Sequence, residues 1–229
     1  MHRRAAELTV KTLQTRERQG VGSAKLPGHT GDMFTGIVEG LGRVTQHREE
    51  HGGVRMELDL GAVAEGVRTG DSVAVAGCCL TVEAIEGTRA TFFMMGETLR
   101  LTRFAEVRAG DDLNLERSMK LGDRLGGHLV SGHVDGLGKV REVKRLAGEV
   151  RMTLDVPSSV LRFTIPKGSI TVEGVSLTLA ALGAAEVELA LIPHTLAVTT
   201  LGKLSAGDAV HLEADQIGKW MARLVDATR

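Results

Sequence analysis

Short stretches of the chain alternate apolar and polar residues, a pattern typical of strands that bury one face. The clearest stretches are residues 54–60, 73–75, 113–115 and 152–156. Gly-containing turns such as Glu86-Gly87 and Ala109-Gly110-Asp111 lie between them. Short strands separated by regular turn signals predict small antiparallel β-barrels.

The same unit occurs twice along the chain. Residues 35–44 align with residues 131–140 at an offset of 96 (131 minus 35), and residues 77–82 and 109–116 align with residues 174–179 and 206–213 at an offset of 97 (174 minus 77). This period is far longer than the roughly 20–50 residues of solenoid repeats, so each copy is expected to be a domain. We therefore predict an all-β fold of two tandem, homologous Greek-key barrels, over residues 33–128 and 129–214.

The two ends of the chain depart from the repeat. Residues 1–32 match neither copy and are expected to form a disordered extension, with a functional arm as the alternative. Whether Met1 or Met33 starts the protein is left open. Residues 215–229 are expected to form an amphipathic helix that Asp215 caps, because apolar residues recur at the spacing of one helix face. These residues are Ile217, Trp220, Met221, Leu224 and Val225. The helix could cover its own barrel or pair with other subunits.

Composition narrows the class of protein. The net charge of −1 and the low aromatic content of 3% argue against a nucleic-acid partner. No apolar run approaches the roughly 20 residues of a membrane span, and the first residues lack the apolar core of a signal peptide. Cys78 and Cys79 are neighbours, so a disulfide between them would be strained. We expect a cytoplasmic protein with no membrane partner.

Several familiar catalytic motifs are absent. Gly40-x-Gly42 lacks the third glycine of a dinucleotide site, and no Walker sequence occurs. The segment around Ser176 fails the Gly-x-Ser-x-Gly elbow at its last position. His128 and His133 are five residues apart, unlike the His-x-x-x-His pair that binds zinc on a helix, so no metal site is expected.

Comparison of the two copies singles out candidate site residues. His133 occupies the position that Ile37 fills in the first copy, so the fold tolerates an aliphatic side chain there. An imidazole in that position can transfer protons near neutral pH. For His128, a structural role in the turn is equally open.

The other candidates are polar pairs at equivalent positions. Cys79 aligns with Ser176, and because neighbouring strand residues face opposite sides, Cys79 rather than Cys78 should face the pocket. Asp215 aligns with Ser118. A buried structural thiol and a helix cap are the alternatives for Cys79 and Asp215. Two similar sites with unlike polar groups suit a reaction between two similar molecules.

A set of motifs then resembles the lumazine-binding repeats of the riboflavin synthase family, over residues 33–225. The motifs are Met33-Phe34-Thr35-Gly36-Ile37-Val38-Glu39-Gly40, Gly77-Cys78-Cys79-Leu80-Thr81-Val82, Glu97-Thr98-Leu99-Arg100, residues 122–136, Ser176-Leu177-Thr178 and Ile192-Pro193-His194-Thr195-Leu196. The resemblance implies a cofactor-free and metal-free dismutation of two 6,7-dimethyl-8-ribityllumazine molecules into riboflavin and 5-amino-6-(D-ribitylamino)uracil. It also implies a homotrimer, whose sites lie between barrels of different subunits, and a possible association with lumazine synthase.

The resemblance also implies the site residues. In the first repeat they are Gly36, Ile37, Val38, Ser72, Cys79, Leu80, Thr81, Met94, Met95, Gly96, Glu97 and Thr98. In the second they are Gly132, His133, Val134, Lys167, Ser176, Leu177, Thr178, Leu191, Ile192, Pro193, His194, Thr195 and Leu196. The catalytic roles fall to His133 and Ser72 for proton handling, Cys79 for nucleophilic or polar assistance with Ser176 as its counterpart, and Asp215 for orientation across the subunit interface.

The chain departs from the usual family pattern at a few positions. These are Ala76 in place of Asn, Glu173 in place of Asp, His211 in place of Asn, and Arg103-Phe104-Ala105 where the second repeat has Thr200-Leu201-Gly202. We expect them to affect ligand affinity and loop shape more than the reaction. A non-catalytic chromophore protein built from the same repeats is the main alternative function. A flavin-dependent oxidoreductase is a second one, although the chain has no room for a nicotinamide domain.

Overall fold

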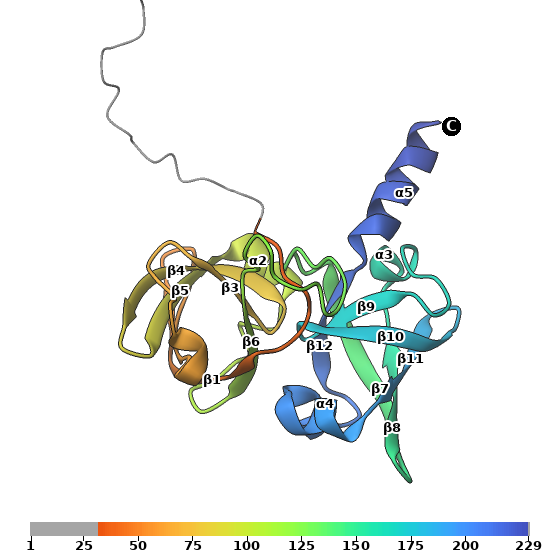
Figure 1. Ribbon diagram of the computed structural model, residues 1–229, viewed down its shortest axis with the longest axis horizontal. Helices are drawn as coiled ribbons and strands as arrows, with labels where there is room; N and C mark the ends of the chain where they lie inside the picture. The colour runs from red at the N-terminus through yellow and green to blue at the C-terminus, as the bar shows by residue number, and fades with distance from the viewer. Residues whose placement is uncertain (1–31, 229) are drawn as a thin grey trace, which may run out of the picture. The chain divides into compact units, whose positions relative to one another are not determined.

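The computed structural model describes residues 32–228 and contains two closed antiparallel β-barrels followed by a helix (Figure 1). The first barrel consists of β1 (Gly40–Glu50), β2 (Gly53–Asp59), β3 (Ser72–Val75), β4 (Cys78–Glu86), β5 (Arg89–Met95) and β6 (Asp112–Arg117). The second consists of β7 (Gly136–Leu146), β8 (Glu149–Asp155), β9 (Ser169–Val172), β10 (Val175–Leu182), β11 (Glu186–Leu191) and β12 (Ala209–Ala214). The predicted fold class is confirmed. The disorder expected for residues 1–32 concerns positions that, apart from Asp32, lie outside the described residues.

The two barrels share one topology. The first closes in the order β1-β2-β5-β4-β3-β6, and the second closes in the equivalent order, with β12 beside β9 and β7. In each barrel the last strand returns beside the first of three hairpin-connected strands, which is the Greek-key arrangement. β-Bulges fall at matching places, between Val44 and Gln46 in β1 and between Val140 and Glu142 in β7. Matching bulges bend both barrels at the same point.

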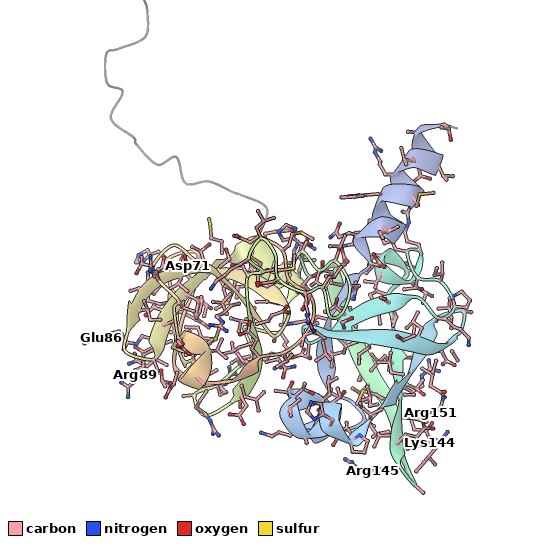
Figure 2. All side chains as sticks on the ribbon, in the orientation of Figure 1. Asp71, Glu86, Arg89, Lys144, Arg145 and Arg151 are labelled. Carbon is pink, nitrogen blue, oxygen red and sulfur yellow. The ribbon has the colours of Figure 1, made fainter. Side chains whose placement is uncertain are left out.

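Alternation along the strands builds the cores. In β2 and β8 every second residue is buried, and Met56 and Met152 are completely inside. The polar residues between them face solvent. Figure 2 shows Lys144 and Arg145 at the outer end of the β7–β8 hairpin and Glu86 and Arg89 at the tip of the β4–β5 hairpin. The charged side chains at these tips therefore lie outside the two cores.

The structure also contains short helices that the sequence pattern did not predict. They are η1 (Gly61–Ala64), α2 (Gly96–Leu101), α3 (Ser158–Leu161), α4 (Pro193–Val198) and η2 (Thr200–Lys203). Elements this short show no clear helical period, so alternation alone does not distinguish them from loops. α2 and α4 occupy equivalent places after β5 and β11. After the last residue of each helix, a threonine hydroxyl donates a hydrogen bond of 2.7 Å to a carbonyl of the helix. Thr102 donates to the Thr98 carbonyl in α2, and Thr199 donates to the Thr195 carbonyl in α4.

Two hairpin turns meet where the barrels adjoin. Ala76-Gly77 joins β3 to β4 and Glu173-Gly174 joins β9 to β10, and all four residues have positive φ, between 46° and 82°. Two-residue turns of this kind match the twist of the strands they connect. A Cβ atom on Gly77 would lie 2.6 Å from the Gly174 nitrogen. Glycine is therefore required at this contact by both backbone conformation and space.

The segments that precede the barrels cross from one barrel to the other. We call residues 34–38 the first strap and residues 130–134 the second strap. They pair at Phe34 and Val130, whose backbone groups exchange hydrogen bonds of 2.8 and 3.1 Å. The Gly36 carbonyl accepts the Ser176 N–H of β10, and the Gly132 carbonyl accepts the Cys79 N–H of β4. Each strap thus lies on a strand of the opposite barrel.

The predicted C-terminal helix is α5 (Gln216–Ala227), and Asp215 caps it by accepting the Ile217 N–H at 2.9 Å. Its five apolar residues are between 48% and 65% exposed, with Trp220 the most exposed. The helix therefore does not bury this face on its own barrel. Across residues 32–228, no helix has the length and apolar character needed to cross a membrane.

Candidate functional site

The second barrel carries a cavity of about 430 Å³ at the position predicted for a ligand. Most of the residues predicted for the second repeat line it. The lining residues are Lys167, Ser176, Leu177, Thr178, Leu179, Ala180, Ala190, Leu191, Ile192 and Thr195. A largely apolar cavity of this size, with a few polar groups, is typical of small-molecule sites. Pro193, His194 and Leu196 of the predicted set lie in α4 beside it.

His128 lies behind Ser176 at this cavity. A hydrogen bond of 2.7 Å joins His128 Nδ1 to Ser176 Oγ, and one of 3.3 Å joins His128 Nε2 to Thr171 Oγ1. Burial lowers the pKa of His128, although the charge of Asp215 opposes this shift. His128 therefore contacts a predicted site residue as well as supporting a turn, a role that the sequence did not reveal.

On the first barrel, Ser72 and Cys79 lie on the neighbouring strands β3 and β4. Ser72 Oγ donates a hydrogen bond of 2.6 Å to the carboxylate of Asp32. Cys79 packs against Phe34, Ala74 and Val130 on the outside of the barrel, whereas Cys78 belongs to the core. Cys79 therefore faces away from the core, as a pocket residue must, and its place in a ligand pocket stays a prediction.

The two cysteines are both held as thiols. Burial raises the pKa of Cys78 to about 12. Burial also raises the pKa of Cys79, assisted by the charges of Asp32 and Glu213, while a hydrogen bond with Ser72 lowers it in part. Since the thiolate is the nucleophilic form, this environment favours polar assistance by Cys79 over nucleophilic attack.

The straps change how the predicted residues are grouped. From the sequence we assigned Gly36, Ile37 and Val38 to the pocket of the first repeat, but Gly36 lies against Ser176 and Val38 packs on the second core. The second strap does the reverse: Gly132 lies against Cys79, and Val134 joins the first core. The assignment by repeat was wrong because each strap precedes the first strand of its own barrel and is free to cross. His133 is thereby brought to the side of Cys79, with its side chain exposed.

The remaining predicted residues of the first repeat divide between core and surface. Leu80 and Met94 belong to the first core, while Thr81, Met95, Gly96 and Glu97 are exposed and Thr98 is half-buried. Arg100 pairs with Glu97 at 2.7 Å on the surface of α2. Asp215 lies at the start of α5, where it lines a cavity between this helix and residues 162–169. The helix-cap role left open for Asp215 is therefore observed.

Two buried glutamates were missed as site residues. Glu116 accepts hydrogen bonds from the Thr35 and Gly36 N–H groups, and Glu213 accepts them from those of Ser131 and Gly132. The repeat alignment contains a usable signal, because a glutamate recurs at the same position of two strands, directly after the core residues Leu115 and Leu212. An acidic side chain in such a place needs partners, and here the partners are the straps.

Comparison with known proteins decides the family. A family model described as "Lumazine binding domain" matches residues 35–118 and 131–215. The chain is 42% identical over 197 residues to a riboflavin synthase of Brucella abortus, covering 84% of this chain and 98% of that protein. It is 37% identical over 193 residues to a riboflavin synthase of Bacillus subtilis, covering 84% and 90%. The chain belongs to the riboflavin synthase family. Like the enzymes of that family, it is a transferase.

Solved structures agree on the fold. LumP complexed with riboflavin superposes with a TM-score of 0.74, and LumP complexed with 6,7-dimethyl-8-(1'-D-ribityl) lumazine with a TM-score of 0.72. Both are 24% identical to this chain and cover 79% of it and 98% of their own length. At this identity the likeness establishes the two-barrel architecture of the family.

The departures from the riboflavin synthase pattern turn out to contact one another between the barrels. Arg103 pairs with the carboxylate of Glu173 at 2.6 and 3.1 Å, and Glu173 is fully buried. His211 Nδ1 donates to the Ala76 carbonyl at 2.8 Å, and His211 Nε2 accepts the Arg103 N–H at 2.9 Å. Four residues that differ from the family pattern therefore form one buried cluster. Their expected effect on ligand affinity and loop shape, rather than on the reaction, stays a prediction.

Asn114 on β6 is the repeat equivalent of His211 on β12, and its amide makes the same kind of contacts. Asn114 Nδ2 donates to the Glu173 carbonyl and Asn114 Oδ1 accepts the Thr200 N–H, both at 2.8 Å. His211 makes the same pair of bonds with one donor and one acceptor nitrogen. This pattern requires a neutral ring, because a protonated His211 would point a second donor at the Arg103 N–H.

The charges of the cluster agree with a neutral histidine. Burial lowers the pKa of His211, and the Arg103 charge adds to this effect while Glu173 opposes it. Burial also disfavours ionisation of Glu173, yet its pKa is lowered by its neighbours. A charge on His211 would lower it most, but the hydrogen bonds of the ring require a neutral His211, which leaves Arg103 and the His211 N–H to lower it. Because His211 is neutral, Arg103 is the cation that stabilises the Glu173 carboxylate.

We expect His211→Asn to make the free energy of unfolding depend less on pH under acidic conditions. A histidine whose pKa is lowered in the folded state contributes stability that is present above its ordinary pKa of 6.5 and is lost as the pH falls below it. The wild type should lose up to about 1.4 kcal/mol per pH unit from this group, and the variant should not. Urea unfolding between pH 7.5 and 5 measures the difference, with His51→Asn in the exposed β1–β2 turn as control. Equal slopes for all three proteins would contradict a neutral His211.

Proposed function

We propose that this protein makes riboflavin by dismutation, in which one 6,7-dimethyl-8-ribityllumazine molecule transfers a four-carbon unit to another. The products are riboflavin and 5-amino-6-(D-ribitylamino)uracil. The observation that carries the proposal is the pair of related but unlike sites, with Cys79 and Ser176 at equivalent positions of two barrels. The membership of the riboflavin synthase family supports the same reaction.

The two sites have different chemistry. The first-barrel site combines Asp32, Ser72, Cys79 and the strap that carries His133. The second-barrel site combines Ser176 with the buried His128 and places the aliphatic Ile37 in the strap position. The reaction needs a proton removed from the C7 methyl group of one lumazine and a nucleophile added to the other. We assign proton handling to the first-barrel site, where the exposed imidazole of His133 and the hydroxyl of Ser72 are available.

Orientation supplies a further part of the rate enhancement. Holding two reactants in a productive arrangement is worth about 7–11 kcal/mol of the barrier, without any covalent step. In this proposal one subunit contributes a first-barrel site and another contributes a second-barrel site, so the two ring systems meet between subunits of a homotrimer. Asp215, at the start of α5, would orient groups at that boundary. Association with lumazine synthase, which would supply the substrate, and a reducing compartment such as the cytoplasm, which suits the two free thiols, belong to the same proposal.

The direct test supplies the purified full-length protein with 6,7-dimethyl-8-ribityllumazine alone and follows riboflavin by absorbance and chromatography. Formation of riboflavin without any nucleotide is the expected result. Binding of the lumazine without riboflavin formation would instead identify a non-catalytic chromophore protein. A requirement for a nicotinamide nucleotide would identify an oxidoreductase.

The proposed trimer predicts the behaviour of α5 variants. Trp220→Glu combined with Leu224→Glu should dissociate the assembly, because each large apolar side chain contributes about 1.5–3 kcal/mol when fully buried. Sedimentation velocity measures the change. Arg223→Glu changes the net charge of the same helix by the same amount at an exposed polar position, and it should remain assembled. A double variant that still sediments as a trimer would exclude α5 as the assembly element.

A further inference from the structure

Glu116 and Glu213 are buried acids that the proposed reaction does not use. Glu116 lies on β6 and Glu213 on β12, and they are 6% and 2% exposed. Burial raises the pKa of each, while hydrogen bonds from the straps lower it in part. Burying a carboxyl group is costly unless its oxygens are satisfied, so the contacts that satisfy them indicate what each acid holds.

Glu213 holds the turn at the start of the second strap. Its Oε1 accepts the Ser131 N–H at 2.8 Å and the Ser131 hydroxyl at 2.7 Å, and its Oε2 accepts the Gly132 N–H at 2.9 Å. The Ser131 hydroxyl in turn accepts the His133 N–H at 3.3 Å. A continuous chain of hydrogen bonds therefore leads from Glu213 to the backbone of His133.

The other side of the same strap is fixed to the first barrel. The Gly132 carbonyl accepts the Cys79 N–H at 2.8 Å, and Gly132 has a φ of +76°. A Cβ atom at Gly132 would lie 2.6 Å from the Cys79 Cβ. The second strap is thus held between Glu213 of the second barrel and Cys79 of the first. These contacts fix the backbone that leads into His133.

The first turn of α5 reinforces this arrangement. Gln216 Nε2 donates to the Ser131 hydroxyl at 2.7 Å, and Lys219 pairs with Asp135, just beyond the strap, at 2.7 Å. The first strap has no such helix beside it among the described residues, and Arg117 pairs there with Glu39. Glu116 nevertheless makes the equivalent three bonds, to the Thr35 N–H, the Thr35 hydroxyl and the Gly36 N–H.

We propose that Glu213 is a positioning residue for the first-barrel site: from the second barrel, it holds the strap that places His133 beside Cys79. Glu116 plays the reciprocal part for Ser176 and the second-barrel site. The catalytic consequence of this positioning rests on the proposed function.

The geometric claim is tested by the reactivity of Cys79 in the full-length protein. Glu213→Gln replaces an acceptor oxygen with an NH₂ group that faces N–H donors, so the strap should detach from β4. We expect alkylation of Cys79 by iodoacetamide, located by mass spectrometry, to be accelerated about tenfold or more. Glu116→Gln introduces the same change on the other strap and should leave the rate within about twofold of the wild type. Cys79→Ser, which retains only the buried Cys78, provides the blank.

The catalytic consequence is tested by a double-mutant cycle with His133→Gln. If Glu213 acts through His133, Glu213→Gln should lower kcat far more than it changes KM and should have little further effect when His133 is already replaced. A merely structural role would make the two losses multiply. If the wild type forms no riboflavin, the proposed function fails while the alkylation rates still decide the positioning claim.

A milder pair of variants covers the case in which Glu213→Gln does not fold. Ser131→Ala removes one donor to Glu213, and Thr35→Val removes the matching donor to Glu116. Faster alkylation of Cys79 only in Ser131→Ala supports the proposal. The proposal is overturned if the two variants of a pair, Glu213→Gln with Glu116→Gln or Ser131→Ala with Thr35→Val, accelerate the alkylation of Cys79 equally. It is also overturned if neither variant of a pair accelerates it.

Discussion

A His133→Gln variant is expected to form riboflavin about 10²–10⁴-fold more slowly than the wild type, the usual contribution of general acid–base catalysis. The reason is the contrast between the straps: Ile37 occupies the same position in the first copy, so the fold does not require an imidazole there. His133 is exposed beside Cys79, and its replacement should cost little stability. Single-turnover riboflavin formation, measured beside thermal unfolding, tests the expectation.

Two comparisons make this result interpretable. His51→Gln, in the exposed β1–β2 turn, should turn over like the wild type. His128→Gln should lower both stability and ligand affinity, because His128 is buried against Ser176. Near-wild-type turnover by a well-folded His133→Gln protein would exclude proton transfer by this residue.

Removal of the Arg103 charge is expected to be the most destabilising single change at the barrel interface. Arg103→Met leaves the carboxylate of Glu173 buried without its cation, and breaking a buried pair in this way costs about 3–5 kcal/mol. Urea unfolding at pH 7 measures the loss. Arg103→Met combined with Glu173→Gln should recover much of it, because no uncompensated charge remains.

An exposed ion pair provides the contrast. Arg55 pairs with Glu50 on the surface of the first barrel, where such pairs contribute about 0–1 kcal/mol. Arg55→Met should therefore change stability little. A loss below about 1 kcal/mol for Arg103→Met would show that Glu173 takes up a proton or reaches water when its partner is removed.

The fold could be predicted because its signals are local and repeated. Alternation at Met56 and Met152 identifies strands, and the offset of 96–97 residues identifies two copies without any tertiary information. The helix after Asp215 has a full apolar stripe and a capping residue. α2 and α4 escaped prediction because six residues show too little periodicity to separate a helix from a loop.

The candidate site could be predicted residue by residue but not as an arrangement in space. Alignment singles out Cys79, Ser176 and His133, and the cavity on the second barrel contains most of the residues expected there. Alignment does not reveal that a strap crosses to the other barrel, since that depends on contacts such as Gly132 with Cys79. Likewise, the family departures looked independent in sequence, and only packing shows that His211, Arg103 and Glu173 form one cluster.

The crossed straps also constrain how the chain is completed during synthesis. The first strap leaves the ribosome early, but it lies on β10, which emerges only with the second barrel. The Ser176 N–H that donates to this strap belongs to β10. The Cys79 site is likewise incomplete until Gly132 and then Glu213, near the end of the chain, have been made. The second-barrel site therefore needs β10, and the Cys79 site, although it lies on the first barrel, needs the last strand of the second.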